Sequence, residues 1–264
     1  MSINNYLDSL SSILVLKNSE KESIKRSIAT LRQRLNLYFD NIEEMIEFGS
    51  FTRGTILPRK ADPKSDIDFM IVFDNSNDYK PQTYLNQLKR FAEKYYSSSE
   101  IFQSSPTIVL SLNHIKFELV PAYTSGPLWK TYYIPAPRNT FYEWIETRPN
   151  EFNETLTRKN GQENNKVKPM VRLAKYWNAT NGYVYSSFLL EKYIVEQGYG
   201  YYCSSISDYF FEFVQRLSTV HLSQSSANKV HCLQRAINEI IILKRQGNEG
   251  VAEIKIKKLL PQID

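Results

Sequence analysis

The amino-acid sequence predicts an α+β fold with a helical N-terminal segment, a small mixed sheet and an all-helical C-terminal half. Three observations support this prediction. The continuous apolar run Ile67–Phe73 is typical of a buried strand. Two later segments, TIVLSL and IKFELVPAY, also have the composition of strands. From about Asn139 onward the strand signals fade, and apolar residues recur with helical spacing.

The composition is that of a globular chain with a mild basic excess. The 264 residues are 42% hydrophobic and 23% charged, with a formal net charge of +5, which suits an anionic ligand such as a nucleotide. Only Cys203 and Cys232 occur, so a disulfide framework is not expected, and the three histidines show no zinc-ligand spacing with them. No window approaches the roughly 20 apolar residues of a membrane span, so we expect no membrane partner and a cytoplasmic location.

The N-terminal segment, residues 1–45, is expected to be helical. Ser19 and Glu22 form the S-x-x-E pattern of a capping box. Apolar residues follow with helical spacing at Ile24, Ile28, Leu31, Leu35 and Tyr38. This pattern predicts one capped amphipathic helix.

Residues 46–138 are expected to form a core domain that contains the sheet. The stretch MIEFGS indicates a short strand that runs into a turn, and the apolar run Ile67–Phe73 follows it. Pro81 is expected to open a helix, because proline is favoured at the first helical position. That helix would turn Leu85, Leu88, Phe91 and Tyr95 inward.

Residues 139–264 are expected to form a helical subdomain. Polar joints are expected at Thr157–Lys166 and His221–Lys229. Helical spacing occurs around Phe141–Ile145, Val167–Trp177, Ser187–Val195, Ile206–Leu217 and Val230–Leu243.

Three acidic residues of the core point to a metal site. Asp66 and Asp68 are two residues apart at the start of a strand, so their side chains face the same way. Glu118, on a later strand, is placed to approach them from a neighbouring position. Carboxylates gathered in this way repel one another unless cations bind, and oxygen ligands favour Mg²⁺ or Mn²⁺ over zinc. Two such ions clamp the attacking and leaving oxygens of a phosphoryl displacement.

A Gly-Ser turn precedes the acidic pair. Gly49 allows close backbone approach, and the Ser50 hydroxyl with nearby N–H groups suits a terminal phosphate. Arg53 would either contact the phosphates or pair with the carboxylates. Each of these features alone is usually an ordinary turn, cap or ion pair. Together they favour nucleotidyl transfer, in which an acceptor hydroxyl attacks the α-phosphate of a nucleoside triphosphate and pyrophosphate leaves.

The pattern FGSFTRGT…SDIDFMIVF…IKFELVPAY resembles the nucleotidyltransferase superfamily of DNA polymerase beta. The segments KVKPMVRLAKYWN and VYSSFLLEKYIVE resemble the helical half of the oligoadenylate synthetase and cyclic GMP-AMP synthase branch. That branch includes the bacterial cGAS/DncV-like nucleotidyltransferases (CD-NTases) of antiphage defence. The resemblance covers roughly residues 47–196. It implies a polymerase-beta-like core with the active site in the cleft between sheet and helical subdomain.

The resemblance also implies residue roles. Asp66 and Asp68 would hold both metal ions, Glu118 the ion that activates the acceptor, and Ser50 the terminal phosphates. From the helical side, Lys175 and Ser187 would contact the donor triphosphate, and Phe188 would stack on the donor base. The chain departs from many relatives in having Glu118 where they have Asp, and Phe188 where they often have Tyr.

We therefore expect a Mg²⁺-dependent enzyme that makes a cyclic or linear oligonucleotide messenger from nucleoside triphosphates. ATP, GTP or both are the expected substrates, and bacterial immunity is the expected biological setting. The resemblance leaves room for a regulatory protein or RNA activator. Two alternative hypotheses keep parts of this interpretation. In the first, the enzyme transfers the nucleotide to tRNA, to a protein or to a small molecule. In the second, the chain is a degenerate family member that binds nucleotide without turnover.

Overall fold

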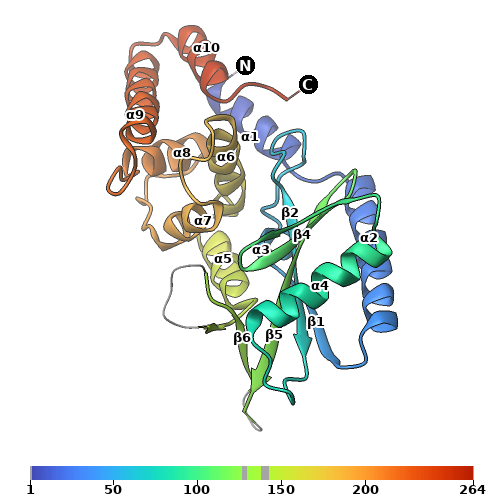
Figure 1. Ribbon diagram of the computed structural model, residues 1–264. Helices are drawn as coiled ribbons and strands as arrows, with labels where there is room; N and C mark the ends of the chain where they lie inside the picture. The colour runs from blue at the N-terminus through green and yellow to red at the C-terminus, as the bar shows by residue number, and fades with distance from the viewer. Residues whose placement is uncertain (1, 127–129, 138–142, 264) are drawn as a thin grey trace. The chain divides into compact units, whose positions relative to one another are not determined.

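The computed structural model describes residues 2–126, 130–137 and 143–263. The chain divides into two compact units that interleave along the sequence. Unit 1 comprises Met1–Leu16, Leu57–Pro63 and Glu154–Asp264, and unit 2 comprises Lys17–Ile56 and Lys64–Asn153. The division expected from sequence was sequential instead, with boundaries after residues 45 and 138. Figure 1 traces both units from the N-terminus to the C-terminus.

Unit 2 is built on one mixed sheet. In the described residues its strands follow the order β1-β2-β5-β4-β3, with β6 paired to β5 and β7 paired to β6. Among the described strands, β2 and β5 pair in parallel and the other pairs are antiparallel. The strands are β1 (Ile42–Phe48), β2 (Asp66–Phe73), β3 (Glu100–Ser104), β4 (Thr107–Ser111), β5 (Lys116–Ser125), β6 (Thr131–Pro135) and β7 (Trp144–Thr147).

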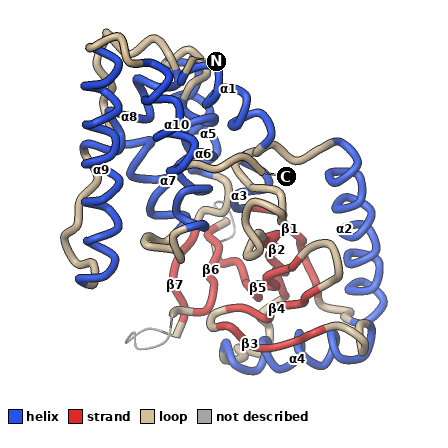
Figure 2. The backbone as a smooth tube through the Cα atoms, turned by 90° about the horizontal axis from the view of Figure 1, so that it is seen from above, coloured by secondary structure: helices blue, strands red, loops and turns tan. Residues whose placement is uncertain are grey.

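The two faces of β2 have different neighbours. Helices α2 (Asn18–Tyr38) and α4 (Pro81–Tyr95) flank the sheet in Figure 2. Phe73 of β2 stacks on Tyr84 of α4 with ring centroids 4.8 Å apart, and Arg32 of α2 lies 5.0 Å from the ring centre of Phe69. The odd-numbered residues of β2 therefore face these helices. The even-numbered ones, including buried Met70, face the other way, because side chains alternate along a strand.

The beginning of α2 and the segment before α5 (Glu151–Gln162) differ from the predictions. The predicted capping box at Ser19 and Glu22 was wrong, because α2 begins after Lys17, whose N–H donates to the Glu20 carboxylate at 2.8 Å. The predicted helical segment Phe141–Ile145 ends in a strand instead, since β7 uses the strand-forming sequence WIET and pairs with β6. Positions 141 and 142 of that prediction lie outside the described residues.

Unit 1 is helical in its described part. The predicted helices at Val167–Trp177, Ser187–Val195 and Val230–Leu243 are confirmed, and the one predicted at Ile206–Leu217 is confirmed as far as Gln215. The predicted joints at Thr157–Lys166 and His221–Lys229 are only partly correct, because α5 continues to Gln162 and α9 begins at Gln224. The helices are α1 (Ile3–Ile13), α5, α6 (Val167–Thr180), α7 (Ser187–Glu196), α8 (Ile206–Gln215), α9 (Gln224–Arg245) and α10 (Glu249–Leu259).

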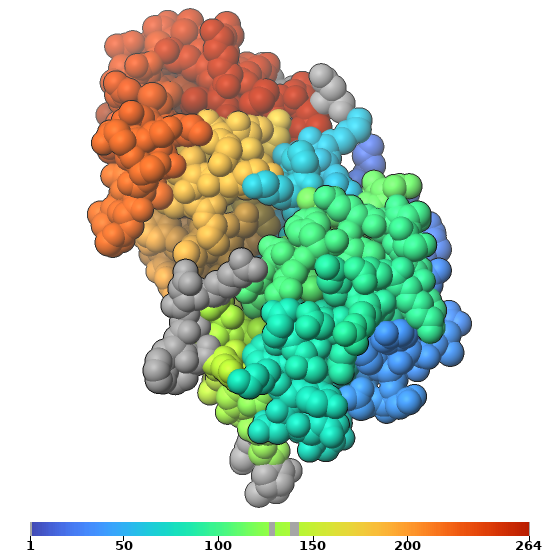
Figure 3. All heavy atoms as spheres, in the orientation of Figure 1, coloured from blue at the N-terminus to red at the C-terminus, as the bar shows by residue number. Residues whose placement is uncertain are grey.

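Helix α6 supplies much of the core of unit 1. Tyr176 and Trp177 are buried there, as expected for packing residues. The Tyr176 hydroxyl donates to the Pro261 carbonyl at 3.1 Å, and the Tyr6 hydroxyl to the Leu260 carbonyl at 2.5 Å, so hydrogen bonds hold the C-terminal tail in place. Atoms of α9 and α10 form the orange-to-red surface in Figure 3. None of the helices in the described ranges combines the length and apolar character that a bilayer crossing requires.

Candidate active site

The three acidic residues share one face of the unit 2 sheet. In the parallel ladder between β2 and β5, Asp68 lies directly opposite Glu118, and Asp66 lies opposite Lys116. Register partners on neighbouring strands point to the same face, and Asp66 shares that face because it is two residues from Asp68. This is the face opposite the one that packs against α2 and α4. Parallel pairing of β2 with β5 is therefore what brings Glu118 to the aspartate pair.

The carboxyl group of Glu118 is in an unusual electrostatic environment. Burial raises its pKa above the ordinary value, although hydrogen bonds with Thr107 and Asp66 and the charge of Lys116 act in the opposite direction. The Thr107 hydroxyl reaches Glu118 Oε2 at 3.5 Å and also donates to the Ser104 carbonyl at 2.9 Å. The side chains of Asp66 and Glu118 thus lie close together on this face of the sheet.

The acidic face fits a divalent cation by its donor chemistry. Carboxylate oxygens are the ligands that Mg²⁺ and Mn²⁺ prefer. Within the described ranges, no three carboxylate, imidazole or thiol side chains converge closely enough to enclose an ion as they stand. Asp66, Asp68 and Glu118 are the residues whose oxygen atoms would hold such an ion, because they share this face of the sheet.

The Gly-Ser turn contacts the acidic face directly. Gly49 begins α3 (Gly49–Arg53) with φ +77°, in the left-handed region that favours glycine. A Cβ atom at this position would overlap the Asp68 carboxylate and lie 2.5 Å from its Cγ. The preceding residue, Phe48, is the β1 partner of Asp68 in the antiparallel ladder. The glycine is therefore required twice, by its backbone angle and by the closeness of Asp68.

Ser50 lies in the same turn. Its carbonyl accepts hydrogen bonds from the N–H groups of Thr55 and Ile56, both at 3.0 Å, which close the loop after α3. Gly54, with φ +70°, ends the helix and allows the chain to turn back. The position of Ser50 is thus fixed by backbone hydrogen bonds, and its side chain lies one residue from the glycine that touches Asp68.

Arg53 is buried, with only 7% of its surface exposed, and its guanidinium lies 5.5 Å from the ring centre of Phe152. This cation–π contact and its burial show that Arg53 packs α3 against the start of α5. The sequence left two roles open for Arg53, phosphate contact or ion pairing with the carboxylates. Packing against Phe152 is a third role of Arg53, which the sequence did not indicate.

Two asparagines that the sequence did not single out also hold α3. Asn150 Nδ2 donates to the Glu47 carbonyl at 3.3 Å, and Asn153 Nδ2 donates to Thr52 Oγ1 at 3.1 Å. Asn153 Nδ2 also donates to Asn150 Oδ1 at 2.8 Å. These residues lie about 100 positions from the turn in sequence, and isolated asparagines carry no signal that predicts such pairing. They connect the Gly-Ser turn to α5.

The remaining predicted nucleotide contacts lie in unit 1. Lys175 of α6 is 5% exposed, and its ammonium group pairs with Glu191 of α7 at 3.0 Å. Ser187 is the first residue of α7, and Phe188 follows it with 48% of its surface exposed. Phe188 is therefore accessible to a base, whereas Lys175 would have to leave Glu191 to reach a phosphate.

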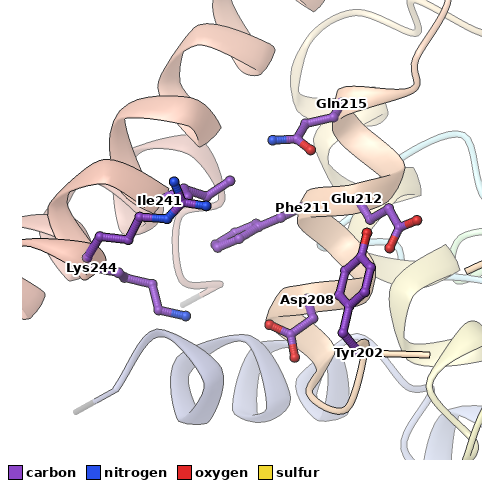
Figure 4. A pocket seen from close by; sticks show the side chains of 8 residues that line it. Tyr202, Asp208, Phe211, Glu212, Gln215, Ile241 and Lys244 are labelled. Carbon is purple, nitrogen blue, oxygen red and sulfur yellow. The ribbon is translucent and has the colours of Figure 1, made fainter. Parts of the chain in front are cut away.

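A separate hollow lies between α8 and α9 of unit 1, with a volume of about 460 Å³ (Figure 4). Asp208 and Glu212 line it opposite Lys244, with the ring of Phe211 between them. Hydrogen bonds within the chain already engage both acids: Asp208 accepts from the Ser205 N–H at 2.9 Å, and Glu212 from the Cys203 thiol at 2.8 Å. None of the predicted site residues lines this hollow.

Residues 1–160 match the family described as the Second Messenger Oligonucleotide or Dinucleotide Synthetase (SMODS) domain. A probable cyclic nucleotide synthase of Bacillus cereus (strain VD146) is 29% identical over 189 residues, which are 58% of this chain and 55% of that protein. The chain thus matches only about half the length of this curated relative.

Solved structures share the fold across nearly the whole chain. CdnC of E. coli MS115-1, solved with ATP, superposes with a TM-score of 0.73 over 98% of both chains at 14% identity. The CD-NTase CdnG of Bradyrhizobium diazoefficiens, solved with GTP, gives 0.67 over 96% of this chain and 97% of that one at 11% identity. The Vibrio cholerae cyclic AMP-GMP synthase DncV gives 0.63 over 83% and 68% at 11% identity. The predicted α+β nucleotidyltransferase fold is confirmed.

Proposed function

The chain belongs to the Second Messenger Oligonucleotide or Dinucleotide Synthetase family of nucleotidyltransferases, and from this premise we propose that it is a Mg²⁺-dependent enzyme that joins nucleoside triphosphates into a cyclic or linear oligonucleotide. One observation carries the proposal. Asp66, Asp68 and Glu118 share one sheet face, and the backbone of Gly49 touches the carboxylate side chain of Asp68. This arrangement joins an acidic surface for divalent ions to a turn suited to phosphate.

The carboxylates act as the ion-binding side of this site. Bound divalent ions would neutralise the α-phosphate and lower the pKa of the acceptor hydroxyl. Asp66 and Asp68 would hold both ions, and Glu118 would hold the one nearer the acceptor. Burial raises the pKa of Glu118, and a bound cation would act in the opposite direction by favouring the charged carboxylate. Divalent ions would also offset the repulsion among the three carboxylates.

The proposed nucleotide contacts come from the Gly-Ser turn and, separately, from α6 and α7. The Ser50 hydroxyl and the N–H groups around it would contact the terminal phosphates. Arg53 would stabilise α3 through its cation–π contact with Phe152. The exposed ring of Phe188 would stack on the donor base, which needs only a flat face, and Ser187 would contact the triphosphate. That Lys175 contacts phosphate stays a prediction, and this contact would require its ammonium group to leave Glu191.

Nucleoside triphosphates, with ATP and GTP foremost, are the proposed substrates. The relatives solved with ATP and with GTP support this choice. The resemblance to CD-NTases supports antiphage defence as the biological setting. A plaque assay would test it, because cells that express the chain should resist phage and cells with the double asparagine variant described next should not.

The activity is tested by incubating the protein with Mg²⁺ and all four labelled triphosphates, then measuring pyrophosphate and identifying products by mass spectrometry. The variant Asp66→Asn with Asp68→Asn should lose product formation. Its matched control is Asp74→Asn with Asp78→Asn, which also removes two charges. Asp78 has φ +49°, a backbone angle that asparagine tolerates. Product from the first pair, or equal loss from both, would contradict the metal assignment.

The same assay separates the two alternatives. If label is transferred only when tRNA, a protein or a small molecule is added, that added molecule is the acceptor and the first alternative holds. Nucleotide binding by calorimetry without pyrophosphate release would indicate a member that binds but does not turn over.

A further inference from the structure

The turn between α6 and α7 holds a tyrosine in a strained conformation. Tyr183 has φ +59°, which costs a residue with a side chain about 1–2 kcal/mol. Its N–H donates to the Asn178 carbonyl at 2.8 Å. The fully buried Asn178 amide also bonds both the N–H and the carbonyl of Tyr185, each at 2.9 Å. The surrounding hydrogen bonds therefore impose this conformation on Tyr183.

The strained residue binds a buried acid. The Tyr183 hydroxyl donates to Asp62 Oδ1 at 2.7 Å, and Asp62 is only 5% exposed. A buried carboxylate without donors is strongly disfavoured, so this hydrogen bond stabilises the position of Asp62. The Asp62 N–H in turn donates to the Pro58 carbonyl at 3.0 Å, which closes the loop on itself. Both partners belong to unit 1.

Asp62 lies in the segment that joins the Gly-Ser turn to β2. The segment Leu57–Pro63 packs in unit 1, although it joins the Gly-Ser turn to β2, both of which belong to unit 2. Asp62 precedes Asp66 by four residues, so fixing one restricts the backbone that carries the other. We propose that Tyr183 is a positioning residue: by binding Asp62 it fixes this connecting segment and thereby the start of β2, where Asp66 lies. This inference rests on the proposed function of Asp66.

Backbone strain that the surroundings impose is often found where geometry serves a function. A simple turn between two helices would not need a tyrosine at a left-handed position, since glycine or asparagine adopts it at lower cost. The neighbouring Gly182, with φ +78°, already supplies such freedom. The hydroxyl contact to Asp62 is what the strained residue adds.

The test compares Tyr183→Phe with Tyr185→Phe in the full chain. The control loses a hydrogen bond of the same length, from the Tyr185 hydroxyl to the Ser218 carbonyl at 2.7 Å. Arg59, Lys60 and Lys64 lie within or beside the segment, so trypsin reports its opening. Cleavage there should be about tenfold faster in Tyr183→Phe, the ratio expected from losing one hydrogen bond to a charged group. In Tyr185→Phe it should match the wild type.

The second readout is the Mg²⁺ concentration that gives half the maximal rate. Tyr183→Phe should raise it about threefold or more and lower kcat about tenfold, because a shifted Asp66 holds the ion less well. The KM for triphosphate should change far less. Combining Tyr183→Phe with Asp62→Ala should speed cleavage no more than Asp62→Ala alone, since both remove the same contact.

Equal cleavage rates in the two phenylalanine variants would overturn the inference. Faster cleavage with an unchanged Mg²⁺ requirement would overturn the positioning role. A wild-type protein without any nucleotidyl transfer would instead refute the proposed function, and the cleavage comparison would still decide whether Tyr183 fixes the segment.

Discussion

Replacing Gly49 with alanine tests the contact between the Gly-Ser turn and the acidic face. Two effects are expected. The left-handed φ of +77° should cost about 1–2 kcal/mol of folding stability once a side chain is present. The new Cβ would also lie 2.5 Å from Asp68 Cγ. Carbon atoms in contact are normally separated by about 3.5 Å, so the turn and Asp68 must move apart by about 1 Å.

A displacement of that size at a reacting centre lowers the rate about 100-fold. Gly54→Ala is the matched control, because Gly54 ends the same helix with φ +70° and an added Cβ there would meet nothing within 4 Å. In urea unfolding, Gly54→Ala should lose only the stability that the backbone angle costs, and Gly49→Ala should lose at least as much. Only Gly49→Ala should lose about 100-fold in pyrophosphate release with Mg²⁺. Equal activity in the two variants would refute the argument that Gly49 protects the position of Asp68.

Three further predictions concern partly or fully buried ionisable groups. Glu118→Gln should abolish transfer yet raise the unfolding temperature of the metal-free protein at pH 7 more than at pH 4. Folding raises the pKa of Glu118, so this residue stabilises the folded state at pH values below its ordinary pKa, and that stabilisation is lost as the pH rises through the raised pKa. An equal increase in unfolding temperature at pH 4 and pH 7 would contradict this reasoning. Lys175→Met should destabilise the chain by about 3–5 kcal/mol in urea unfolding, because it removes the ammonium group that pairs with the buried Glu191 carboxylate at 3.0 Å. Lys175→Met with Glu191→Leu should recover most of the loss, and no recovery would argue against the pair. Burial and a hydrogen bond to Glu212 raise the pKa of Cys203 to about 12, so in the native protein a thiol reagent should modify exposed Cys232 first and Cys203 only on unfolding; two equally fast thiols would disprove the assignment.

Alternation along a strand made part of the candidate site predictable. Asp66 and Asp68 must share a face wherever the strand lies, and the run that follows them is apolar enough to be buried on both sides. The position of Glu118 is different. It depends on parallel pairing of β2 with β5 across an intervening helix and two strands, and on a register in which a shift of one residue would turn Glu118 to the other face. Local sequence patterns do not determine that register.

The contacts around the turn were unpredictable for a similar reason. Gly49 was expected to allow close approach, but its neighbour, Asp68, is known only from the structure. Lys175 was expected to contact the donor triphosphate because the family resemblance places a phosphate contact at its position, and the point charge of a lysine suits phosphate. Its pairing with Glu191 arises from the packing of α6 on α7, which brings together residues 16 positions apart. The strand β7 was missed because a four-residue strand leaves too short a pattern to distinguish from one helical turn.

The parallel ladder between β2 and β5 also governs when the site can exist during synthesis. Glu118 emerges from the ribosome fifty residues after Asp68, its register partner, and the pairing of strands so distant in sequence forms slowly. A nascent or truncated chain that stops before β5 carries both aspartates but lacks the third carboxylate. The proposed chemistry would therefore be withheld from incomplete products of translation, since the acidic face is assembled only when the sheet is.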